Sequence, residues 1–356
     1  MRIDWSLLLR LVALGSVLGI AGALIFGFLG RFHPAFDSFS HFRIHLAVLL
    51  LIAILPLAAL RYWPEAAFAL LLGTGAIWTT LGGFSDTSAR KAGLVADLDA
   101  ASMPVFRLMH LNLRYDNDRP ELVLSAIGEH RPDIVTLTEV SGVWAERLSV
   151  LDATYPHRIV CPPPTHIGGV AILSRRPFVS NPADACGDRG SFANVEVDFA
   201  GRRASVVAMH LGWPWPFGQS WHLSRIEDDL PNLADSAILA GDFNAVPWSQ
   251  TVRRTAELGG LHIVRGIGPT YLDRRLPDAL RPWIGLPIDQ IMAKGGVVVG
   301  KAQALHAVGS DHLPVLVEFS ILPQEPEAEV LQALNSRVIP EWDRRAATRP
   351  YPGAIP

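Results

Sequence analysis

Three long apolar runs fill most of the first 90 residues and constrain what this chain can fold into. The first run, Leu11–Gly30, is uncharged and has about the 20 residues that a helix needs to cross a bilayer core. Two further runs, Ile44–Leu60 and Ala66–Gly83, are separated by the sequence RYWPE, which suits an interfacial turn. Pro56 is tolerable in a span because neighbouring helices can satisfy the backbone group that it frees. We predict a bundle of three transmembrane helices in a membrane region of residues 1–90.

The alternatives are a signal peptide followed by a buried hairpin, or a soluble core, although no small-residue cleavage site follows the first run. We expect a multi-pass protein of the cytoplasmic membrane, with the lipid bilayer as a partner. Three spans would place the N-terminus and the rest of the chain on opposite sides. Counting positive charges does not decide the orientation. One side holds Arg2, Arg10 and Arg61, and the other holds Arg31, Arg43, Arg90 and Lys91.

From about residue 103 the sequence changes to short β-rich runs broken by turn residues. Stretches with a helical pattern, 121–130, 143–151 and 220–233, lie between some of these runs. The mixture predicts an α/β domain over residues 103–321 in which helices cover sheets. Residues 322–356, rich in proline and charge, predict a short helix with a loose tail. The predicted strands are VFRLMHL, DIVTLTEV, GGVAILS, FANVEVDF, ASVVAMHL, SAILAGDF, IDQIMA and PVLVEF.

The composition disfavours several functions. The formal net charge is -3, so the chain lacks the basic excess that binding to a nucleic-acid backbone usually needs. Only two cysteines occur, too few for a disulfide scaffold and without the CxxC spacing of a zinc or redox motif. Nonspecific binding to nucleic acid is therefore disfavoured, and no obligate protein partner is implied.

Polar side chains end several of the predicted strands. Asn112 ends HLN, where an asparagine taken alone is more often a turn former. Glu139 ends the buried run DIVTLTEV, where a carboxylate needs a partner, so a structural salt bridge and a metal ligand stay open as alternatives. His210 closes ASVVAMHL, and a lone histidine after a strand is more often a hydrogen-bonded structural residue.

Two short motifs carry stronger signals. In GDFNAVPWS a glycine permits a tight turn after an apolar strand, and Asp242 and Asn244 point to the same side of an extended backbone. One of them can orient a water or ligate a metal while the other donates to a phosphate oxygen. In GSDHLPV, Asp311 stands beside His312 just before the last strand. Asp289, in PIDQIM, can hold that imidazole by its other nitrogen.

In combination and in this order, these residues resemble the endonuclease/exonuclease/phosphatase superfamily, with GDFN and SDH as its most specific signatures. The segment GGVAILSRRPF also matches, and the resemblance covers about residues 105–320. It implies a four-layer α/β/β/α sandwich of two mixed sheets. It also implies a divalent metal, Mg²⁺ or Mn²⁺, at an all-oxygen site, which fits the absence of a cysteine or histidine cluster in the sequence.

Matching positions carry the superfamily's roles onto this chain. The implied metal ligands are Asn112, Glu139 and Asp311, with Glu139 as the principal one. The implied catalytic residues are His210, Asp242, Asn244, Asp289 and His312. Asp242 would orient or activate water, Asn244 and His210 would stabilise charge on phosphorus, and His312, held by Asp289, would bind phosphate or assist proton transfer. The division of the base role between Asp242 and His312 stays open. The reaction is metal-assisted in-line attack of water on a phosphoester.

The substrate is not fixed by these motifs, because the superfamily acts on DNA, inositol phosphates, nucleotides and phospholipids. Directly after His210, the stretch HLGWPWPFGQSW holds Trp213, Trp215, Phe217 and Trp221. These side chains can pack on their own domain or lie at a membrane interface, where tryptophan is favoured. Base stacking is a third interpretation, weakened by the lack of accompanying positive charge.

Membrane spans next to such a domain favour a phosphate carried by a lipid. The layout also resembles the bacterial membrane proteins typified by VanJ, which implies undecaprenyl pyrophosphate outside the cytoplasmic membrane as substrate. We expect a membrane-anchored, divalent-metal-dependent phosphohydrolase acting on a lipid phosphate or pyrophosphate. The alternatives are a membrane-tethered nuclease and a degenerate domain that only binds. The intact set of polar residues argues against the degenerate domain.

The two cysteines, Cys161 and Cys186, bear on the compartment. We predict that they form a disulfide, which requires an oxidising environment and would place the catalytic domain outside the cytoplasm. Two unpaired cysteines acting as small apolar side chains are the alternative.

Overall fold

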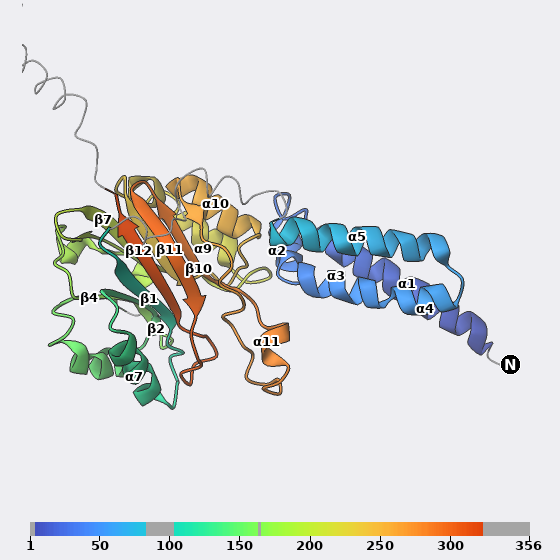
Figure 1. Cartoon of the computed structure of the whole chain (residues 1–356), viewed down its shortest axis with the longest axis horizontal. Helices are drawn as coiled ribbons and strands as arrows, with labels where there is room; N and C mark the ends of the chain where they lie inside the picture. Colours follow the sequence, from blue (N-terminus) through green and yellow to red (C-terminus); the bar gives the residue numbers. More distant parts are fainter. Residues whose placement is uncertain (1–3, 83–102, 163–164, 323–356) are drawn as a thin grey trace, which may run out of the picture. The chain divides into compact units, whose positions relative to one another are not determined.

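The computed structural model describes residues 4–82, 103–162 and 165–322, and its N-terminal part is helical (Figure 1). Small and apolar side chains pack where these helices meet, with Ala21 and Leu24 of one helix in the same buried cluster as Ala47 and Leu50 of another. The helices of this part are α1 (Trp5–Phe26), α2 (Pro34–Ser40), α3 (Arg43–Ile52), α4 (Ile54–Ala59) and α5 (Trp63–Leu81).

The structure corrects the prediction of three transmembrane helices. Within the described residues, α1 is the one helix that is long and apolar enough to cross a membrane. It has 22 residues, and 17% of its most apolar window is buried, so it is not the core helix of a soluble domain. Its length, its apolar surface and its place near the N-terminus fit a membrane anchor or a signal sequence.

The second and third predicted spans fail for different reasons. The second is broken into α3 and α4 close to Pro56, and it passes the same test only together with α2, at a bend of 61°. Helix α5 has the charged Glu65 in its first turn and contains glycine and threonine, which lowers its hydropathy. The described residues therefore contain one candidate membrane span, or two if α2 and the α3–α4 segment together form a bent span. Of the remaining predictions, Gly83 and the tail at residues 323–356 lie outside the described residues.

Two six-stranded mixed sheets follow the helices. One has the order β11-β12-β1-β2-β4-β3, and the other has the order β5-β6-β7-β8-β10-β9. The strands of the first sheet are β1 (Phe106–Asn112), β2 (Ile134–Val140), β3 (His157–Val160), β4 (Gly169–Ser174), β11 (Val297–Ala304) and β12 (Val315–Ile321). Those of the second are β5 (Cys186–Gly187), β6 (Phe192–Asp198), β7 (Arg203–His210), β8 (Ala237–Asp242), β9 (His262–Ile263) and β10 (Asp289–Lys294).

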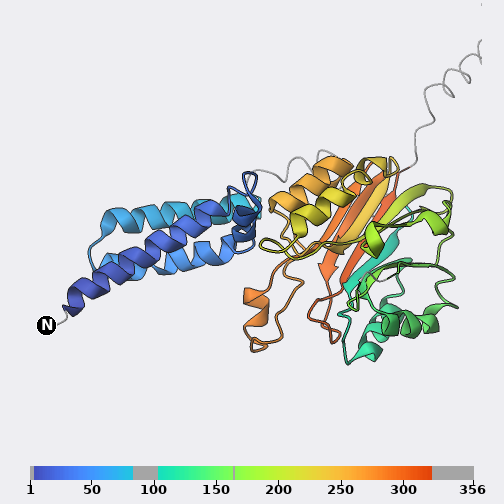
Figure 2. The same ribbon diagram turned by 180° about the vertical axis from the view of Figure 1, so that it is seen from behind.

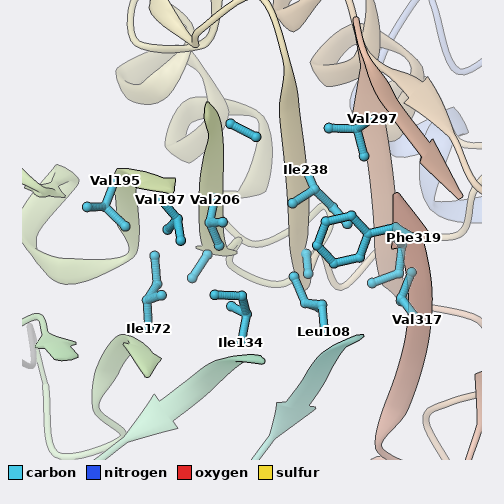
Figure 3. Close-up of a cluster of buried hydrophobic side chains, with 14 of the residues drawn as sticks. Leu108, Ile134, Ile172, Val195, Val197, Val206, Ile238, Val297, Val317 and Phe319 are labelled. Atoms are coloured by element: carbon cyan, nitrogen blue, oxygen red, sulfur yellow. The ribbon is translucent and has the colours of Figure 1, made fainter. Parts of the chain in front are cut away.

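The main core lies between the two sheets. Alternate side chains of each strand point to the same face, so Leu108 and Ile134 of one sheet meet Val206 and Ile238 of the other (Figure 3). The opposite faces of the sheets are covered by helices, which completes the predicted α/β/β/α order of layers. These are α7 (Pro120–His130) and α8 (Gly142–Arg147) on the first sheet, and α9 (Gln219–Ile226) and α10 (Gln250–Gly259) on the second (Figures 1 and 2).

Shorter helical turns lie in the connections. They are η1 (Leu148–Leu151), η2 (Pro182–Asp184), η3 (Asp188–Gly190), η4 (Leu230–Asn232) and α11 (Arg281–Ile284). The described helices and the sandwich belong to one compact unit. The predicted boundary between a membrane region, 1–90, and a catalytic domain, 103–321, stays a prediction.

Strand direction brings the predicted site residues to one edge. Strands β1 and β2 run parallel, as do β7 and β8, so each pair ends on the same side. His210 lies opposite Asp242 in the register of β7 and β8. Strand β10 runs antiparallel to β8, and its first residue, Asp289, lies opposite Asp242. The ends of five strands therefore supply side chains to one region.

The predicted disulfide is present between Cys161 and Cys186, 25 residues apart. Cys161 directly follows β3, and Cys186 begins β5. Both strands are edge strands, β3 of the first sheet and β5 of the second. The covalent bond therefore ties one edge of the first sheet to one edge of the second.

Candidate active site

Asn112 connects the two sheets at the site. Its side chain is buried, and its Nδ2 donates to Oε1 of Glu139 at 3.1 Å and to Oδ2 of Asp242 at 2.9 Å. Its Oδ1 accepts from the backbone N–H of Arg114 at 2.8 Å. The asparagine thus joins a predicted metal ligand on β2 to the predicted catalytic aspartate on β8.

Glu139 adopts an unusual backbone conformation. Its φ of 57° is in the left-handed region, where the register of β2 against β4 also shifts. Gly168 permits this bend, because a Cβ on it would lie 2.3 Å from the backbone carbon of Val140. The carboxylate of Glu139 accepts from uncharged groups, the amide of Asn112 and the backbone N–H of Tyr115 at 2.9 Å. A half-buried carboxylate whose partners are all uncharged is a suitable ligand for a hard cation.

The GDFN turn places Asp242 and Asn244 beside each other. Oδ1 of Asp242 accepts from the backbone N–H of Asn244 at 2.8 Å, and Asn244 has a φ of 48°. Gly241 is required at this point because a Cβ there would lie 2.1 Å from the carbonyl oxygen of Met209. The side-chain Nδ2 of Asn244 donates to the carbonyl of Leu211 at 2.9 Å, next to the end of β7.

Two histidines flank Asp242. Nε2 of His210 and Nε2 of His312 each lie 3.7 Å from Oδ2 of Asp242. These separations exceed hydrogen-bond length but allow ion pairing. The oxygen of Asp242 that points between the two rings also accepts from Asn112. One carboxylate oxygen is therefore close to two imidazoles and an amide.

Asp289 holds His312 as the sequence predicted. Oδ2 of Asp289 accepts from Nδ1 of His312 at 2.8 Å, with both residues buried. Burial alone would lower the pKa of His312, but the charges of Asp289 and Asp242 and the hydrogen bond outweigh it and raise that pKa to about 10. Burial alone would raise the pKa of Asp289, but His312 and His110 hold it well below its usual range. The two form an ion pair at neutral pH.

Sequence reasoning missed His110, in the middle of β1. It is fully buried, its Nε2 lies 3.3 Å from Oδ1 of Asp289, and its Nδ1 lies 3.1 Å from Oγ1 of Thr136. The hydroxyl of Thr270 accepts from the backbone N–H of Asp289 at 3.2 Å. A histidine inside the apolar run VFRLMHL was the available signal, but such a residue within a strand gives no indication of its partner.

A second missed group supports His210. The backbone N–H of His210 donates to the carbonyl of Ser191 at 2.8 Å, and the hydroxyl of Ser191 contacts Nε2 of His222 at 2.9 Å. That nitrogen also lies 2.7 Å from Oδ2 of Asp188, while Nδ1 of His222 accepts from the N–H of Gly212 at 3.0 Å. The cluster fixes the backbone on both sides of His210, where the aromatic stretch begins.

Two groups of side chains in the site could be considered for a metal ion. Ligand atoms of Asp242, Asp289 and His312 lie within 4.8 Å of one another, which by spacing alone could hold a cation. However, Nδ1 of His312 is engaged by Asp289, so this ring could offer only Nε2 to a cation. The oxygens of Glu139 and Asn112 fit a hard cation better.

Among the predicted metal ligands, Asp311 has the least direct hydrogen-bond connection to the others. Its side chain is half-buried, and its Oδ1 is 3.5 Å from the hydroxyl of Ser310. That hydroxyl also donates to the carbonyl of Asn112 at 2.8 Å, which places Ser310 against the end of β1. Among the described residues, no hydrogen bond joins Asp311 to Glu139. The backbone places Asp311 beside the site, and its role as a ligand stays a prediction.

Two sheets that converge on carboxylates, amides and a histidinium define a metal-dependent phosphoric ester hydrolase. A model of the Endonuclease/Exonuclease/phosphatase family matches residues 109–312. The chain belongs to this family, which confirms the resemblance seen in the sequence. No curated protein matches the chain significantly.

Solved structures share the fold at low sequence identity. TDP2 of D. rerio, complexed with a single-strand DNA product, is 16% identical, with a TM-score of 0.50 over 61% of this chain and 99% of that one. ANGEL2, a 2',3'-cyclic phosphatase in complex with adenosine-2',3'-vanadate, is 16% identical, with a TM-score of 0.50 over 62% of this chain and 96% of that one. An endonuclease/exonuclease/phosphatase from Beutenbergia cavernae DSM 12333 is 22% identical, with a TM-score of 0.48 over 61% and 72%.

Proposed function

We propose that the protein is a membrane-anchored phosphohydrolase that uses Mg²⁺ or Mn²⁺ and acts on a lipid phosphate or pyrophosphate, such as undecaprenyl pyrophosphate. The observation that carries the proposal is the exposed aromatic loop after His210. Its large side chains are each more than half exposed, so packing on their own domain does not account for them. They are Trp213, Trp215 and Phe217 in the loop and Trp221 in the first turn of α9, at 58%, 51%, 66% and 67%.

The aromatic loop lies beside the N-terminal helices. The hydroxyl of Ser38, in α2, donates to the carbonyl of Trp215 at 3.0 Å. Helix α2 follows the apolar helix α1 after a short connection. Tryptophan is favoured where lipid headgroups meet hydrocarbon. A catalytic rim with exposed tryptophans next to an anchor helix suits a substrate whose phosphate is at a membrane surface.

A cavity of about 300 Å³ supports an apolar substrate. Residues of the N-terminal helices and of the sandwich both line it, and its apolar lining includes Ile44, Leu81, Trp248, Ile267, Trp283 and Leu286. Asp289, which holds His312, also contributes to its wall. This size is at the lower end of small-molecule sites, which suits one short stretch of a hydrocarbon chain near the phosphate.

The disulfide supports a catalytic domain outside the cytoplasm. The bond between Cys161 and Cys186 is of a kind that persists in oxidising compartments and is rare in the cytosol. With α1 as an anchor in the cytoplasmic membrane, the sandwich would lie on the outer side. Alkylation of unreduced protein from membranes tests this point, and two labelled thiols would argue for the cytoplasmic side.

Each residue of the site has a distinct task in the proposed hydrolysis. Glu139, with Asn112 and Asp311, would hold the divalent ion, which when bound polarises the phosphoryl group and neutralises charge. Asp242 is the group placed to orient a water and accept its proton. His312, whose pKa is raised by Asp289 and Asp242, would bind a phosphate oxygen or donate a proton, and the base role would then fall to Asp242.

Two further groups would act on the phosphoryl oxygens in this proposal. His210, whose Nε2 faces Oδ2 of Asp242, is placed to bind an oxygen that gains charge as water attacks. Asn244 would contribute through the same turn, since its N–H already fixes the carboxylate of Asp242. Preorganised donors of this kind stabilise the developing charge without reorganisation at the moment of reaction.

The experiment compares two substrates with one enzyme. Release of phosphate from a polyprenyl pyrophosphate in detergent micelles is measured beside nicking of plasmid DNA, with Mg²⁺ and with a chelator. The variants are His312→Ala and, as a matched control, His306→Ala, at an exposed position. We expect release from the lipid that needs Mg²⁺, is lost in His312→Ala and is retained in the control.

The same comparison of substrates also tests the alternative function, a membrane-tethered nuclease. Nicking of DNA without release from the lipid would make the protein a membrane-tethered nuclease and assign the tryptophans to base stacking. Activity on both substrates that survives in His312→Ala would contradict the site as assigned. Repeating the titration with Mn²⁺ identifies the preferred ion by the concentration that gives half of the maximal rate.

A further inference from the structure

The segment from Asp37 to His41, in and directly after α2, contacts both the start of α10 and the catalytic turn, Gly241–Asn244. Asp37, in α2, is buried, and its carboxylate accepts from the backbone N–H groups of Gln250 and Thr251 at 2.7 and 3.0 Å. It also accepts from the hydroxyl of Thr251 at 3.2 Å. Ser249, the N-cap of α10, accepts from the N–H of Val252. A carboxylate at a helix N-terminus satisfies free N–H groups and is favoured by the helix dipole. Asp37 thus completes the cap of α10 from more than 200 residues away in sequence.

Two more contacts reach further into the turn. The indole Nε1 of Trp248 donates to the carbonyl of Ser40 at 2.7 Å. The ring of His41 is buried, and its Nε2 donates to the carbonyl of Asn244 at 3.1 Å. The chain from Asp37 to His41 therefore contacts the segment after β8 at three successive points.

Asn244 needs such support. Its φ of 48° is in the left-handed region, which is unfavourable for a residue other than glycine unless its side chain or its surroundings fix it. The amide of Gln219 donates to the carbonyl of Phe243 at 2.9 Å and to that of Asn244 at 3.3 Å. His41 supplies the other donor to the carbonyl of Asn244. The peptide that follows Asn244 is thereby oriented from two sides.

We infer that His41 is a positioning residue for the catalytic turn and that α2 is part of the catalytic unit, whatever its relation to the membrane. The backbone N–H of Asn244 donates to Asp242, so a rotation of this turn moves the carboxylate that faces His210 and His312. His41 acts on the reaction only through this backbone. The inference does not depend on which phosphoester is the substrate.

The test uses the full chain in detergent and two replacements of His41. His41→Ala removes the donor, whereas the amide of His41→Gln can reach the carbonyl of Asn244 as Nε2 does. Because displacements of about 1 Å can cost up to about 100-fold in rate, we expect His41→Ala to lower kcat about tenfold with little change in KM. His41→Gln should restore most of the rate. The assay uses the substrate that the wild type hydrolyses, polyprenyl pyrophosphate or plasmid DNA, and bis(p-nitrophenyl) phosphate beside it.

Controls separate positioning from loss of the fold. His306→Ala, at an exposed position, should match the wild type. Trp248→Phe removes the N–H that donates to Ser40 together with part of the indole ring, and it should lower kcat in the same direction as His41→Ala. The inference is overturned if His41→Ala keeps the wild-type kcat, or if His41→Gln is as slow as His41→Ala while its melting temperature equals that of the wild type. If the wild type does not hydrolyse the lipid, the proposed substrate is wrong. The effect of the His41 variants on kcat can then still be measured with DNA or with bis(p-nitrophenyl) phosphate.

Discussion

The buried pair of Asp289 and His312 makes the stability of the protein depend on pH. Because the pKa of His312 is raised from 6.5 to about 10, its stabilising contribution is complete below pH 6.5 and is lost as the pH rises through about 10. Because the pKa of Asp289 is held below its usual 3.8, its contribution is present above pH 3.8 and is lost as the pH falls through the lowered value. The pair stabilises the protein most between pH 3.8 and pH 6.5.

Asp289→Asn tests this pair because it keeps the shape and removes the charge. Breaking a buried pair typically costs about 3–5 kcal/mol, so we expect a large fall in melting temperature at pH 6. The difference from the wild type should shrink toward pH 10, where His312 loses its charge in both proteins. Thermal unfolding in detergent with a chelator measures it, with the exposed Asp152→Asn as control. A difference that is the same at both pH values would contradict the assigned ion pair.

At the scale of single residues, the sequence was a good guide to side chains at strand ends. Asn112, Glu139 and Asp242 are joined by hydrogen bonds, and Asp289 holds His312 as predicted. The sequence could not reveal partners inside strands. His110 contacts Asp289 across the two sheets, 179 residues away, and only the packing of the sandwich creates that pair.

The disulfide acts at the scale of elements, because it links the outer strands β3 and β5 of the two sheets. A bond that closes a loop of 25 residues stabilises a fold by about 3 kcal/mol in the chain-entropy account. We expect a variant with Cys161→Ser and Cys186→Ser to melt at a lower temperature and to lose its response to dithiothreitol. Unfolding with and without the reductant measures this. An equal effect of the reductant on the variant and the wild type would show that the bond is not the cause.

Helices with several large apolar side chains were predicted, and a helix with few of them was missed. The predicted helices at 121–130 and 143–151 correspond to α7 and to α8 with η1. Helix α10 was not predicted from the sequence because its apolar face is narrow, with Val252 and Ala256 buried among charged neighbours. Its start also depends on Asp37, a residue that no local pattern can connect to it. In the N-terminal part, apolar composition predicted three spans, but helix breaks and polar starts leave one or two.

At the scale of the whole molecule, the described helices and the sandwich act as one unit through α2. An anchor that only tethered the enzyme would need no buried contacts with the catalytic turn. Here Asp37, Ser40 and His41 are all buried, and they contact the chain from Asn244 to Thr251. His41 and Trp248 from this junction also line the cavity, so the proposed site for the hydrocarbon chain and the support of the catalytic turn share these two residues.

Filling the cavity tests whether it takes the substrate's hydrocarbon chain. Ile267→Trp places a larger side chain at a lining position that is outside the catalytic groups. If the proposed lipid is the substrate, kcat/KM for polyprenyl pyrophosphate should fall about tenfold, since losing about 1.4 kcal/mol of apolar contact has this effect. Hydrolysis of bis(p-nitrophenyl) phosphate, which has no long chain, should be unchanged. Val150→Trp, at an exposed position elsewhere, is the control and should affect neither substrate. Equal losses on both substrates would mean that the substitution disturbs the catalytic turn, and unchanged lipid turnover would exclude the cavity as the site of the chain.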